Sequence, residues 1–506
     1  MDCREGPVCE TLLVQLVSES MARWELAVAL ERGSGTPLYL QIARAIAEDV
    51  RRGRLRAGDR LPGTRTLAQS LHVQRLTVVA AFDELAAEGW IVTQPARGAI
   101  ISPELPEPSP VRRTQTGIPR RVAFELPPAP PGDMPYDVPR GGLLFAPNRP
   151  DIRLAPAELI ARAYRRALRS SGDILLDYGR PQGHERLRAA VADMLASTRG
   201  IAATPDDVCI TRGSQMAIAL LARALIRRGD VVGVEELTYT HAVEAFRLHG
   251  ARIAPLAIDG EGVRIESIEQ TLASGPLRAV YLTPHHQCPT TVTLSTARRM
   301  RLLELARKHQ FAIVEEDYDH EFHYDAAPVL PLASADRAGV VVYAGTFSKV
   351  LAPGLRIGYL VAPPPLLRNI AAHRLYIDVQ GDRTMEFALA DLIERGEVQR
   401  HIRRARREYA RRRDVLVRAL RRALPHELTF DVPAGGIGLW VRAADGIDID
   451  AWSRKARELG AVFVTARAFS VTGRPRPFAR LGFAALNQTE LVEGVRRLAK
   501  ARRALA

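Results

Sequence analysis

Lysine is almost absent from this chain. Only Lys308, Lys349, Lys455 and Lys500 occur in 506 residues, and the other 67 of the 71 basic residues are arginine. The bias indicates a GC-rich genome and is not itself a function. It matters because arginine cannot replace an amine that must lose its proton and attack an aldehyde. A lysine inside a motif of this chain is therefore a candidate for chemistry that arginine cannot perform.

Cysteine and long apolar runs are also scarce. The four cysteines, Cys3, Cys9, Cys209 and Cys288, form no close metal-ligand pair, so we predict reduced thiols and no bound metal. No uninterrupted apolar run reaches the ~18 residues of a membrane helix. Early acids in place of an apolar segment argue against a secretory signal at the N-terminus. These absences predict a protein of the bacterial cytoplasm without a membrane partner.

Positive charge is in excess, and its position matters more than its total of +14. Residues 44–75 contain eight arginines against three acids. The densest basic segment, 395–423, holds 12 arginines against three acids and is predicted to be one long helix. A solvated arginine-rich face explains that segment better than a second DNA site does. Net charge thus supports nucleic-acid binding only weakly.

The first hundred residues divide into an extension and a small domain. Residues 1–35 match no pattern and are expected to be disordered, with Met21 as a natural start and residues 1–20 as a mis-set start or a tail. From 36 to 103, apolar residues recur at helical spacing in three segments, and Gly53 ends the first. The segment after Trp90 alternates around a Pro-Ala-Arg-Gly turn, which predicts a β-hairpin.

A proline-rich linker separates this domain from a larger one. Residues 102–142 hold 11 of the 34 prolines, so we predict a semi-extended linker over 104–142. From 143 to 506, short apolar runs alternate with helical patterns. This alternation predicts an α/β sheet covered on both sides.

One lysine lies in a motif that suits a cofactor aldehyde. Lys349 follows the hydroxyl residues Thr346 and Ser348, and Arg356 lies seven residues further on. An amine can hold the aldehyde of pyridoxal phosphate as a Schiff base, while hydroxyls and a guanidinium hold its phosphate. A surface lysine after a buried strand is the plainer interpretation of a lone Ser-Lys pair. The sixteen-residue context from Gly345 to Leu360 favours the cofactor site.

The pattern S-K-x-x-x-x-G-x-R-x-G resembles the cofactor segment of class I and II aminotransferases. In the N-terminal domain, LPGTRTLA from Leu61 and VQRLTV from Val73 resemble the second and third helices of GntR-type winged helix-turn-helix domains. Together they make residues 36–506 resemble MocR-type regulators of the GntR superfamily. The resemblance implies a winged helix-turn-helix domain at 36–103 joined to a fold-type I, pyridoxal-phosphate-dependent aminotransferase-like domain at 143–506.

The GntR resemblance implies which side chains face double-stranded promoter DNA. The third helix would present its N-terminal residues to the major groove, where base edges and phosphates lie. A helix-turn-helix that serves only protein contacts is the minor alternative. The implied DNA-binding residues are Arg65, Gln74, Arg75, Thr77, Arg97 and Gly98.

The aminotransferase resemblance also implies a cofactor pocket. Gly213, Ser214 and Gln215 start a helix, whose N-terminus favours a phosphate. Tyr239 matches the aromatic residue that stacks on the pyridine ring, and Tyr318 matches the tyrosine that bonds the phenolic oxygen of that ring.

For the acid opposite the ring nitrogen, the sequence offers two candidates. That acid keeps the nitrogen protonated, so the ring withdraws electrons. The usual string E-D-D-Y-D is replaced by Glu315-Glu316-Asp317-Tyr318-Asp319. The register puts Glu316 in the role, one methylene longer than usual, and Asp317 is the alternative.

Two further residues have roles implied by the resemblance. Arg480 matches the residue that holds a substrate α-carboxylate. Tyr178 matches a tyrosine that reaches the phosphate of the neighbouring subunit, which implies a homodimer with shared sites. At His286-Gln287-Cys288-Pro289 the chain departs from the N-P-x-G of aminotransferases. The missing asparagine weakens the case for efficient transamination.

Three functions remain to be weighed. A regulator could use the large domain to sense pyridoxal phosphate, or an amine or amino acid that reacts with it. An aminotransferase could carry an attached DNA-binding domain, or a repressor could have kept the large domain only for dimerisation. The set of Lys349, Tyr239, Ser348 and Arg356 argues against the last. The winged helix favours the regulator, with residual half-reaction chemistry of the aminotransferase type.

Overall fold

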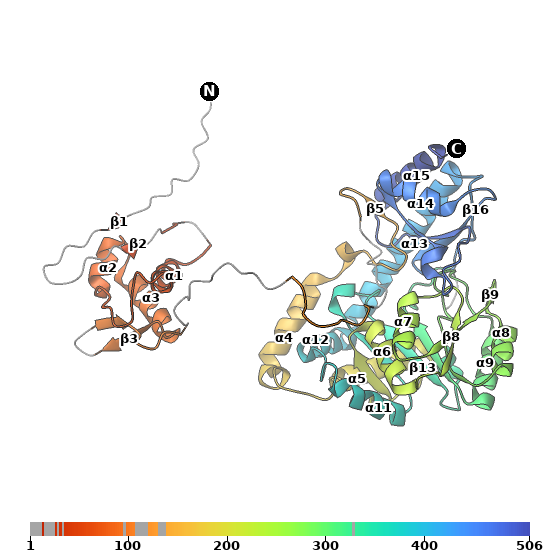
Figure 1. Cartoon of the computed structure of the whole chain (residues 1–506), viewed down its shortest axis with the longest axis horizontal. Helices are drawn as coiled ribbons and strands as arrows, with labels where there is room; N and C mark the ends of the chain where they lie inside the picture. The colour runs from red at the N-terminus through yellow and green to blue at the C-terminus, as the bar shows by residue number, and fades with distance from the viewer. Residues whose placement is uncertain are drawn as a thin grey trace. The chain divides into compact units, whose positions relative to one another are not determined.

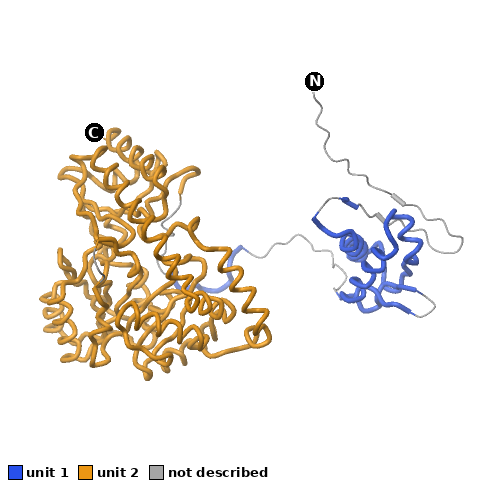
Figure 2. Tube along the Cα trace, turned by 180° about the vertical axis from the view of Figure 1, so that it is seen from behind, with its two compact units in different colours: residues 1–131 blue, residues 132–506 orange. Residues whose placement is uncertain are grey.

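The computed structural model divides the chain into two compact units, Met1–Pro131 and Gly132–Ala506 (Figures 1 and 2). It describes residues 13–14, 26–27, 30–32, 35–94, 98–106, 120–129, 138–325 and 329–505. The predicted extension 1–35 and linker 104–142 lie partly outside these residues. Nowhere in the described ranges is a helix both long and apolar enough to cross a membrane.

The N-terminal unit is a winged helix-turn-helix domain. Three helices, α1 (Leu38–Arg51), α2 (Thr64–Ser70) and α3 (Arg75–Ala87), precede a hairpin of β3 (Ile91–Gln94) and β4 (Gly98–Ile101). The helices bury one apolar face each, which is the origin of the helical spacing in the sequence. The core they share contains Ile42, Ile46, Leu67, Val78 and Leu85. A short pair of strands, β1 (Leu13–Val14) and β2 (Leu26–Ala27), precedes the domain.

The C-terminal unit is built on a seven-stranded sheet with the order β6-β14-β13-β12-β11-β7-β8. All neighbours from β13 to β8 are parallel, whereas β14 runs antiparallel to both β13 and β6. The bounds are β6 (Val208–Thr211), β7 (Val231–Glu235), β8 (Arg252–Leu256), β11 (Leu277–Leu282), β12 (Ala312–Asp317), β13 (Val341–Thr346) and β14 (Gly358–Val361).

Helices cover this sheet, as the apolar strand runs require (Figure 1). Both sheet faces are closed by large apolar clusters, one of which includes α6 and α7 and another α5 and α12. The helices of this part are α4 (Ala157–Leu175), α5 (Glu185–Arg199), α6 (Gly213–Leu225), α7 (Thr240–Leu248), α8 (Ile265–Ala273), α9 (Thr296–His309), α10 (Leu332–Ala335), α11 (Pro364–Leu375) and α12 (Arg383–Glu394). The predicted fold class is therefore confirmed.

A second lobe of the same unit forms around a four-stranded antiparallel sheet. Its order is β15 (Leu428–Thr429), β16 (Gly438–Ala443), β19 (Phe478–Gly482) and β18 (Val464–Thr465). The 27-residue helix α13 (Glu397–Ala423), α14 (Ile449–Glu458) and α15 (Gln488–Arg503) pack on it around a core that contains Trp452. The minor strands are β5 (Leu143–Leu144), β9 (Ile258–Asp259), β10 (Gly262–Val263) and β17 (Ala461–Val462).

The parallel strands place the sequence motifs at one edge of the large sheet. Strands β7, β11, β12 and β13 end at Glu235, Leu282, Asp317 and Thr346. The carboxyl ends of parallel strands meet at the same edge, where α/β proteins bind their ligands. The segments that follow these ends carry Tyr239, the 283–289 loop, Tyr318 and Lys349.

Candidate functional site

Lys349 lies in the tight turn after β13, beside two hydroxyl side chains. Thr346 and Ser348 are buried, and the Ser348 backbone N–H donates to Thr346 Oγ1 over 3.1 Å. Burial lowers the pKa of Lys349, and the nearby Glu316 carboxylate opposes that shift. Desolvation favours the neutral form of an amine. The turn therefore presents an amine suited to react with a carbonyl group.

Arg356 and the start of α6 form a compact cradle. A Cβ atom added at Gly213 would lie 2.8 Å from Arg356 Nη2, and one at Gly358 would lie 2.9 Å from Gly213. Gly358 therefore has no room for a side chain against the backbone, and Gly213, with φ of +76°, adopts a conformation that favours glycine. Arg356 Nη2 also donates to the Arg212 carbonyl over 3.0 Å. The guanidinium thus lies against a helix N-terminus, where unpaired N–H groups favour an anion. This cradle fits a phosphate group.

Gln215 lies in the same first turn of α6. Its Nε2 donates to the carbonyl oxygen of His241 over 3.1 Å. This bond ties the first turn of α6 to the start of α7, the helix that Tyr239 precedes.

Glu316 lies on the side of β12 that faces Lys349. Its carboxylate is buried and accepts a hydrogen bond from the hydroxyl of Tyr281. Burial raises the pKa of Glu316, and hydrogen bonds from Tyr281 and Ser214, with Lys349 nearby, oppose the rise. An acid in this position can bond a protonated ring nitrogen. Tyr281 gave no signal in the sequence because it lies inside an apolar strand.

Asp317, the next residue, lies on the opposite face of β12, as strand alternation requires. It accepts a 2.7 Å hydrogen bond from Tyr343, and His320 Nδ1 lies 3.0 Å from its Oδ2. Burial favours a higher pKa, but His320 and Arg199 outweigh it and lower the pKa of Asp317. The structure therefore does not bring Asp317 together with Lys349.

Tyr239 and Tyr318 come from the segments after β7 and β12. Tyr239 is the N-cap residue of α7, and its ring stacks on His241 with centroids 5.1 Å apart. The Tyr318 hydroxyl donates to the His286 carbonyl over 2.9 Å and lies 3.4 Å from Arg480 Nη2. Tyr318 and Arg480 are thus brought together.

Arg480 is fully buried, and backbone oxygens surround its guanidinium. It donates to the carbonyls of Pro147 and Pro289, and its Nη2 donates to Asn148 Oδ1 over 3.0 Å. Asn148 Nδ2 in turn lies 3.3 Å from the sulfur of Cys288. Asn148 was missed in the sequence because it lies 332 residues from Arg480 and no spacing connects the two.

Tyr178 lies in the loop after α4 and is 80% exposed. The loop is held in place, since Arg383 Nη1 donates to the carbonyls of Asp177 and Tyr178 over 2.8 and 3.1 Å. The structure does not bring Tyr178 together with Lys349 within one chain.

The predicted DNA-binding residues gather at the starts of α2 and α3. Arg65 lies in the first turn of α2, Gln74 is the N-cap residue of α3, and Arg75 begins that helix. All three are exposed, and Arg75 Nε donates to Thr64 Oγ1 over 3.3 Å. This bond ties the two helix starts together.

The rest of this face is only partly described. Thr77 is half-buried and lies in the first turn of α3. Gly98 begins β4 with φ of +80°, a conformation that favours glycine. Arg97 lies outside the described residues. Leu76 is 75% exposed between Arg75 and Thr77. It was missed in the sequence because an apolar residue in a helix suggests core.

Two family descriptions match the two units. Residues 38–101 match bacterial regulatory proteins of the gntR family, and residues 148–498 match aminotransferase class I and II. The "Probable rhizopine catabolism regulatory protein MocR" of Rhizobium meliloti is 32% identical over 476 residues, which is 94% of this chain and 95% of that relative. The chain belongs to the MocR type of gntR-family regulators.

Other relatives of this MocR-type chain fall into two groups. The HTH-type transcriptional regulator TauR of Rhodobacter capsulatus is 28% identical over 94% of this chain and 98% of TauR. Among solved structures, LysN of Thermus thermophilus is an α-aminoadipate aminotransferase complexed with N-(5'-phosphopyridoxyl)-L-leucine. LysN aligns with this chain with a TM-score of 0.68 and 32% sequence identity. The alignment covers 72% of this chain and 93% of the LysN chain.

Proposed function

We propose that this MocR-type regulator binds pyridoxal 5'-phosphate at Lys349 and couples that site to DNA binding. The signal is the cofactor itself, or an amine or amino acid that reacts with it. Residues 36–103 bind double-stranded promoter DNA in the bacterial cytoplasm. The observation that carries the proposal is the pocket of a lysine with a lowered pKa, a glycine-and-arginine cradle and a buried acid.

Each pocket residue has a definable task. Bound there, pyridoxal phosphate would supply an aldehyde for amines and a ring that withdraws electrons. Gly213, Ser214 and Gln215 in the first turn of α6 would hold the phosphate with Arg356, Thr346 and Ser348. Glu316 would keep the ring nitrogen protonated, and Tyr239 would cover one ring face.

Arg480 is the proposed anchor for an effector carboxylate. Its present partners are neutral oxygens of Pro147, Pro289, Asn148 and Tyr318. A carboxylate would form a stronger, charge-assisted pair with the guanidinium than the Asn148 amide does. Asn148 is therefore the partner we expect an amino acid to displace.

A homodimer is part of the proposal. Exposed apolar side chains occur at the end of α4 and just after α11, at Ile174, Leu176, Tyr178, Tyr376 and Ile377. The segments that follow the two helices are in contact, since the Gly179 N–H donates to Gln380 Oε1. Apolar clusters of this kind mark interaction sites. Because the Tyr178 loop is held by Arg383, its ring is positioned for a second copy of the chain.

An aminotransferase with an attached DNA-binding domain is the second candidate. The solved relatives at about 30% identity are aminotransferases, which favours it. Cys288 stands where the aminotransferase pattern N-P-x-G has asparagine, which disfavours fast turnover because small misplacements at the reacting atoms are costly.

One experiment separates the two candidates. Purified protein loaded with pyridoxal phosphate is titrated with amino acids, polyamines and γ-aminobutyrate, while absorption and affinity for its own promoter region are followed. A coupled transaminase assay is run on the same samples, with Lys349→Ala as the control. We expect a ligand that changes both the spectrum and the DNA affinity, with slow or incomplete turnover. Brisk multiple turnover without any ligand effect on DNA binding would support the enzyme instead.

A further inference from the structure

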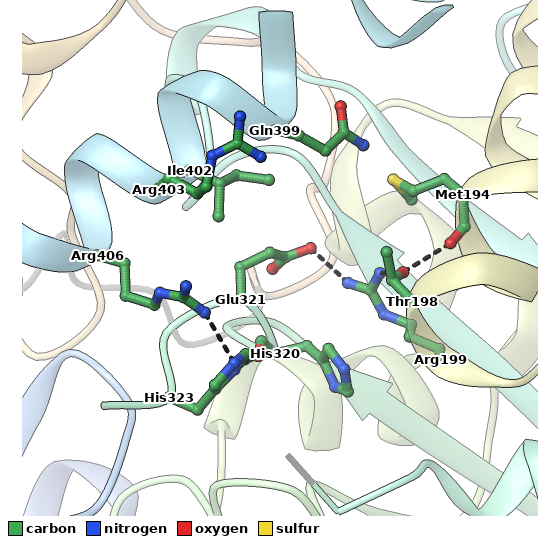
Figure 3. Close-up of a pocket in the computed structure, with 10 residues that line it drawn as sticks. All are labelled: Met194, Thr198, Arg199, His320, Glu321, His323, Gln399, Ile402, Arg403 and Arg406. Carbon is green, nitrogen blue, oxygen red and sulfur yellow. Dashed lines mark hydrogen bonds and ion pairs between the residues drawn. The ribbon is translucent and has the colours of Figure 1, made fainter. Parts of the chain in front are cut away.

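A cavity in the C-terminal unit is lined by none of the residues assigned to the cofactor site. It has a volume of about 160 Å³ and is bounded by the end of α5, the turn after β12 and the first half of α13 (Figure 3). Eight of the ten residues that line it are polar or charged. Those that matter here are Arg199, His320, Glu321, His323, Arg403 and Arg406.

Positive charge exceeds negative charge in this wall. Three arginines face a single carboxylate, Glu321, and that carboxylate already pairs with Arg199 at 2.5 Å. Arg406 Nη1 contacts only a neutral partner, His323 Nε2, at 2.8 Å. Burial and Arg406 lower the pKa of His323, which keeps that ring neutral. Among the described residues, Arg403 and Arg406 thus have no counter-ion.

The nearby acids of α13 do not supply one. Glu397 pairs with Arg400, and Glu408 pairs with Arg412 and lies 3.9 Å from Arg411. Within the described parts of the chain, Arg403 has no acid within ion-pair distance. An unpaired arginine at a concave wall is a donor set suited to a carboxylate or phosphate.

Several buried polar atoms at the wall also make no hydrogen bond. His320 Nε2 and Gln399 Oε1 have none to any described residue, and Arg199 Nε has only an ion-pair contact of 3.9 Å with Asp317 Oδ2. The side chains of Arg199 and His320 are each only 4% exposed. A buried polar atom without a partner costs free energy. A ligand with acceptor oxygens and a donor could satisfy these groups together.

We propose that this cavity binds a small oxyanion, a carboxylate or a phosphate, held by Arg403 and Arg406. The site is distinct from the cofactor pocket but adjoins it through β12. Arg199 and His320 line the cavity and also hold Asp317, which is the chain neighbour of Glu316. Occupancy of the cavity therefore acts on the strand that carries the acid of the cofactor pocket.

The test is a calorimetric titration of the full chain with inorganic phosphate and, separately, with succinate. The key variant is Arg403→Gln/Arg406→Gln. Its matched control, Arg404→Gln/Arg407→Gln, removes the same charge from neighbouring exposed positions of α13 that do not line the cavity. Arg356→Gln is included because phosphate could also bind the cradle at Gly213.

We expect saturable binding of at least one anion by the wild type, by the control and by Arg356→Gln. Loss of two charge-assisted contacts should weaken it at least about tenfold in Arg403→Gln/Arg406→Gln. Binding of phosphate would identify the ligand as a phosphate, and binding of succinate would identify it as a carboxylate. Equal binding by the two double variants, or no saturable binding by the wild type, would overturn the proposal. Binding lost only in Arg356→Gln would assign the anion to the cofactor cradle and also overturn it.

Discussion

Glu316 and Asp317 are consecutive residues of β12, yet their carboxylates lie on opposite faces of the large sheet. Glu316 lies with Tyr281 on the side of Lys349. Asp317 lies with Tyr343 and His320 on the other side. One strand therefore carries an acid for the pocket and an acid for the core beneath it.

Substitution of these two acids should have separable effects. Glu316→Gln should change the absorption and affinity of bound pyridoxal phosphate while leaving stability near that of the wild type, because burial already raises the pKa of Glu316. Asp317→Asn should lose roughly 3–5 kcal/mol of stability, since it removes a buried carboxylate that lies beside Arg199 and His320. Absorption spectra and denaturant unfolding measure the two effects. The reverse pattern would assign the ring-nitrogen role to Asp317.

Lys349 should be the single attachment point of the cofactor. Borohydride treatment of the loaded protein should leave a pyridoxyl group on one peptide, and Lys349→Ala should abolish both the label and the visible absorption band. Lys308→Ala serves as the control and should keep both. A label on Lys308, Lys455 or Lys500, found by peptide mass mapping, would contradict the assignment.

Arg65 and Arg75 should carry much of the affinity for promoter DNA. Removing one phosphate-contacting arginine should lower the slope of log affinity against log salt by about one unit. Replacing a side chain that contacts a base edge should cost roughly 1–3 kcal/mol of binding free energy. Gel shifts over a salt series measure both, with the exposed Arg121→Ala of the same unit as the control. Wild-type binding by Arg65→Ala/Arg75→Ala would refute the assigned DNA face.

Leu76 should contribute to sequence preference. It is exposed at the start of α3, and apolar side chains in the major groove contact the methyl group of thymine. Leu76→Ala should leave the unfolding transition unchanged, because the side chain packs in no core. It should reduce discrimination at one A·T pair by about 1 kcal/mol. Competition binding with single-base variants of the operator tests this, and an unchanged preference at every position would exclude the contact.

Glu235 should make stability depend on pH. Burial raises its pKa to about 7, against hydrogen bonds from Gln287 and Thr283. Between the ordinary pKa and this value the folded state keeps a proton that the unfolded chain releases, so this group's contribution to stability falls as pH rises. The free energy of unfolding of Glu235→Gln, relative to the wild type, should therefore increase from pH 5 to pH 8 by up to roughly 3 kcal/mol. Denaturant unfolding at both pH values measures the change, and a constant difference would contradict it.

Local patterns were enough to predict the fold class and to single out Lys349. Helical spacing in the N-terminal domain indicates which faces are buried. The functional residues of the turn that contains Lys349 lie within a few residues of one another in the sequence. Asn148 and Tyr281 could not be found in this way. Each contacts its partner, Arg480 or Glu316, through a hydrogen bond that exists only once the sheet has formed. The choice between Glu316 and Asp317 was open for a similar reason. It depends on which face of β12 meets the turn after β13, and no local pattern reports that.

The 27 residues of α13 belong to two cores at once, and that has a mechanical consequence. Near its start, Val398 packs in the cluster under the large sheet, whereas from Ala405 onward the helix packs with the four-stranded sheet. A helix of this length spans ~40 Å. It can act as a lever whose pivot lies where the two cores meet, close to Arg403 and Arg406. A tilt of about 5° at this pivot would move the C-terminal end of α13 by roughly 2–3 Å. A small shift at the N-terminal end of the helix would therefore be amplified into a larger shift of the C-terminal lobe.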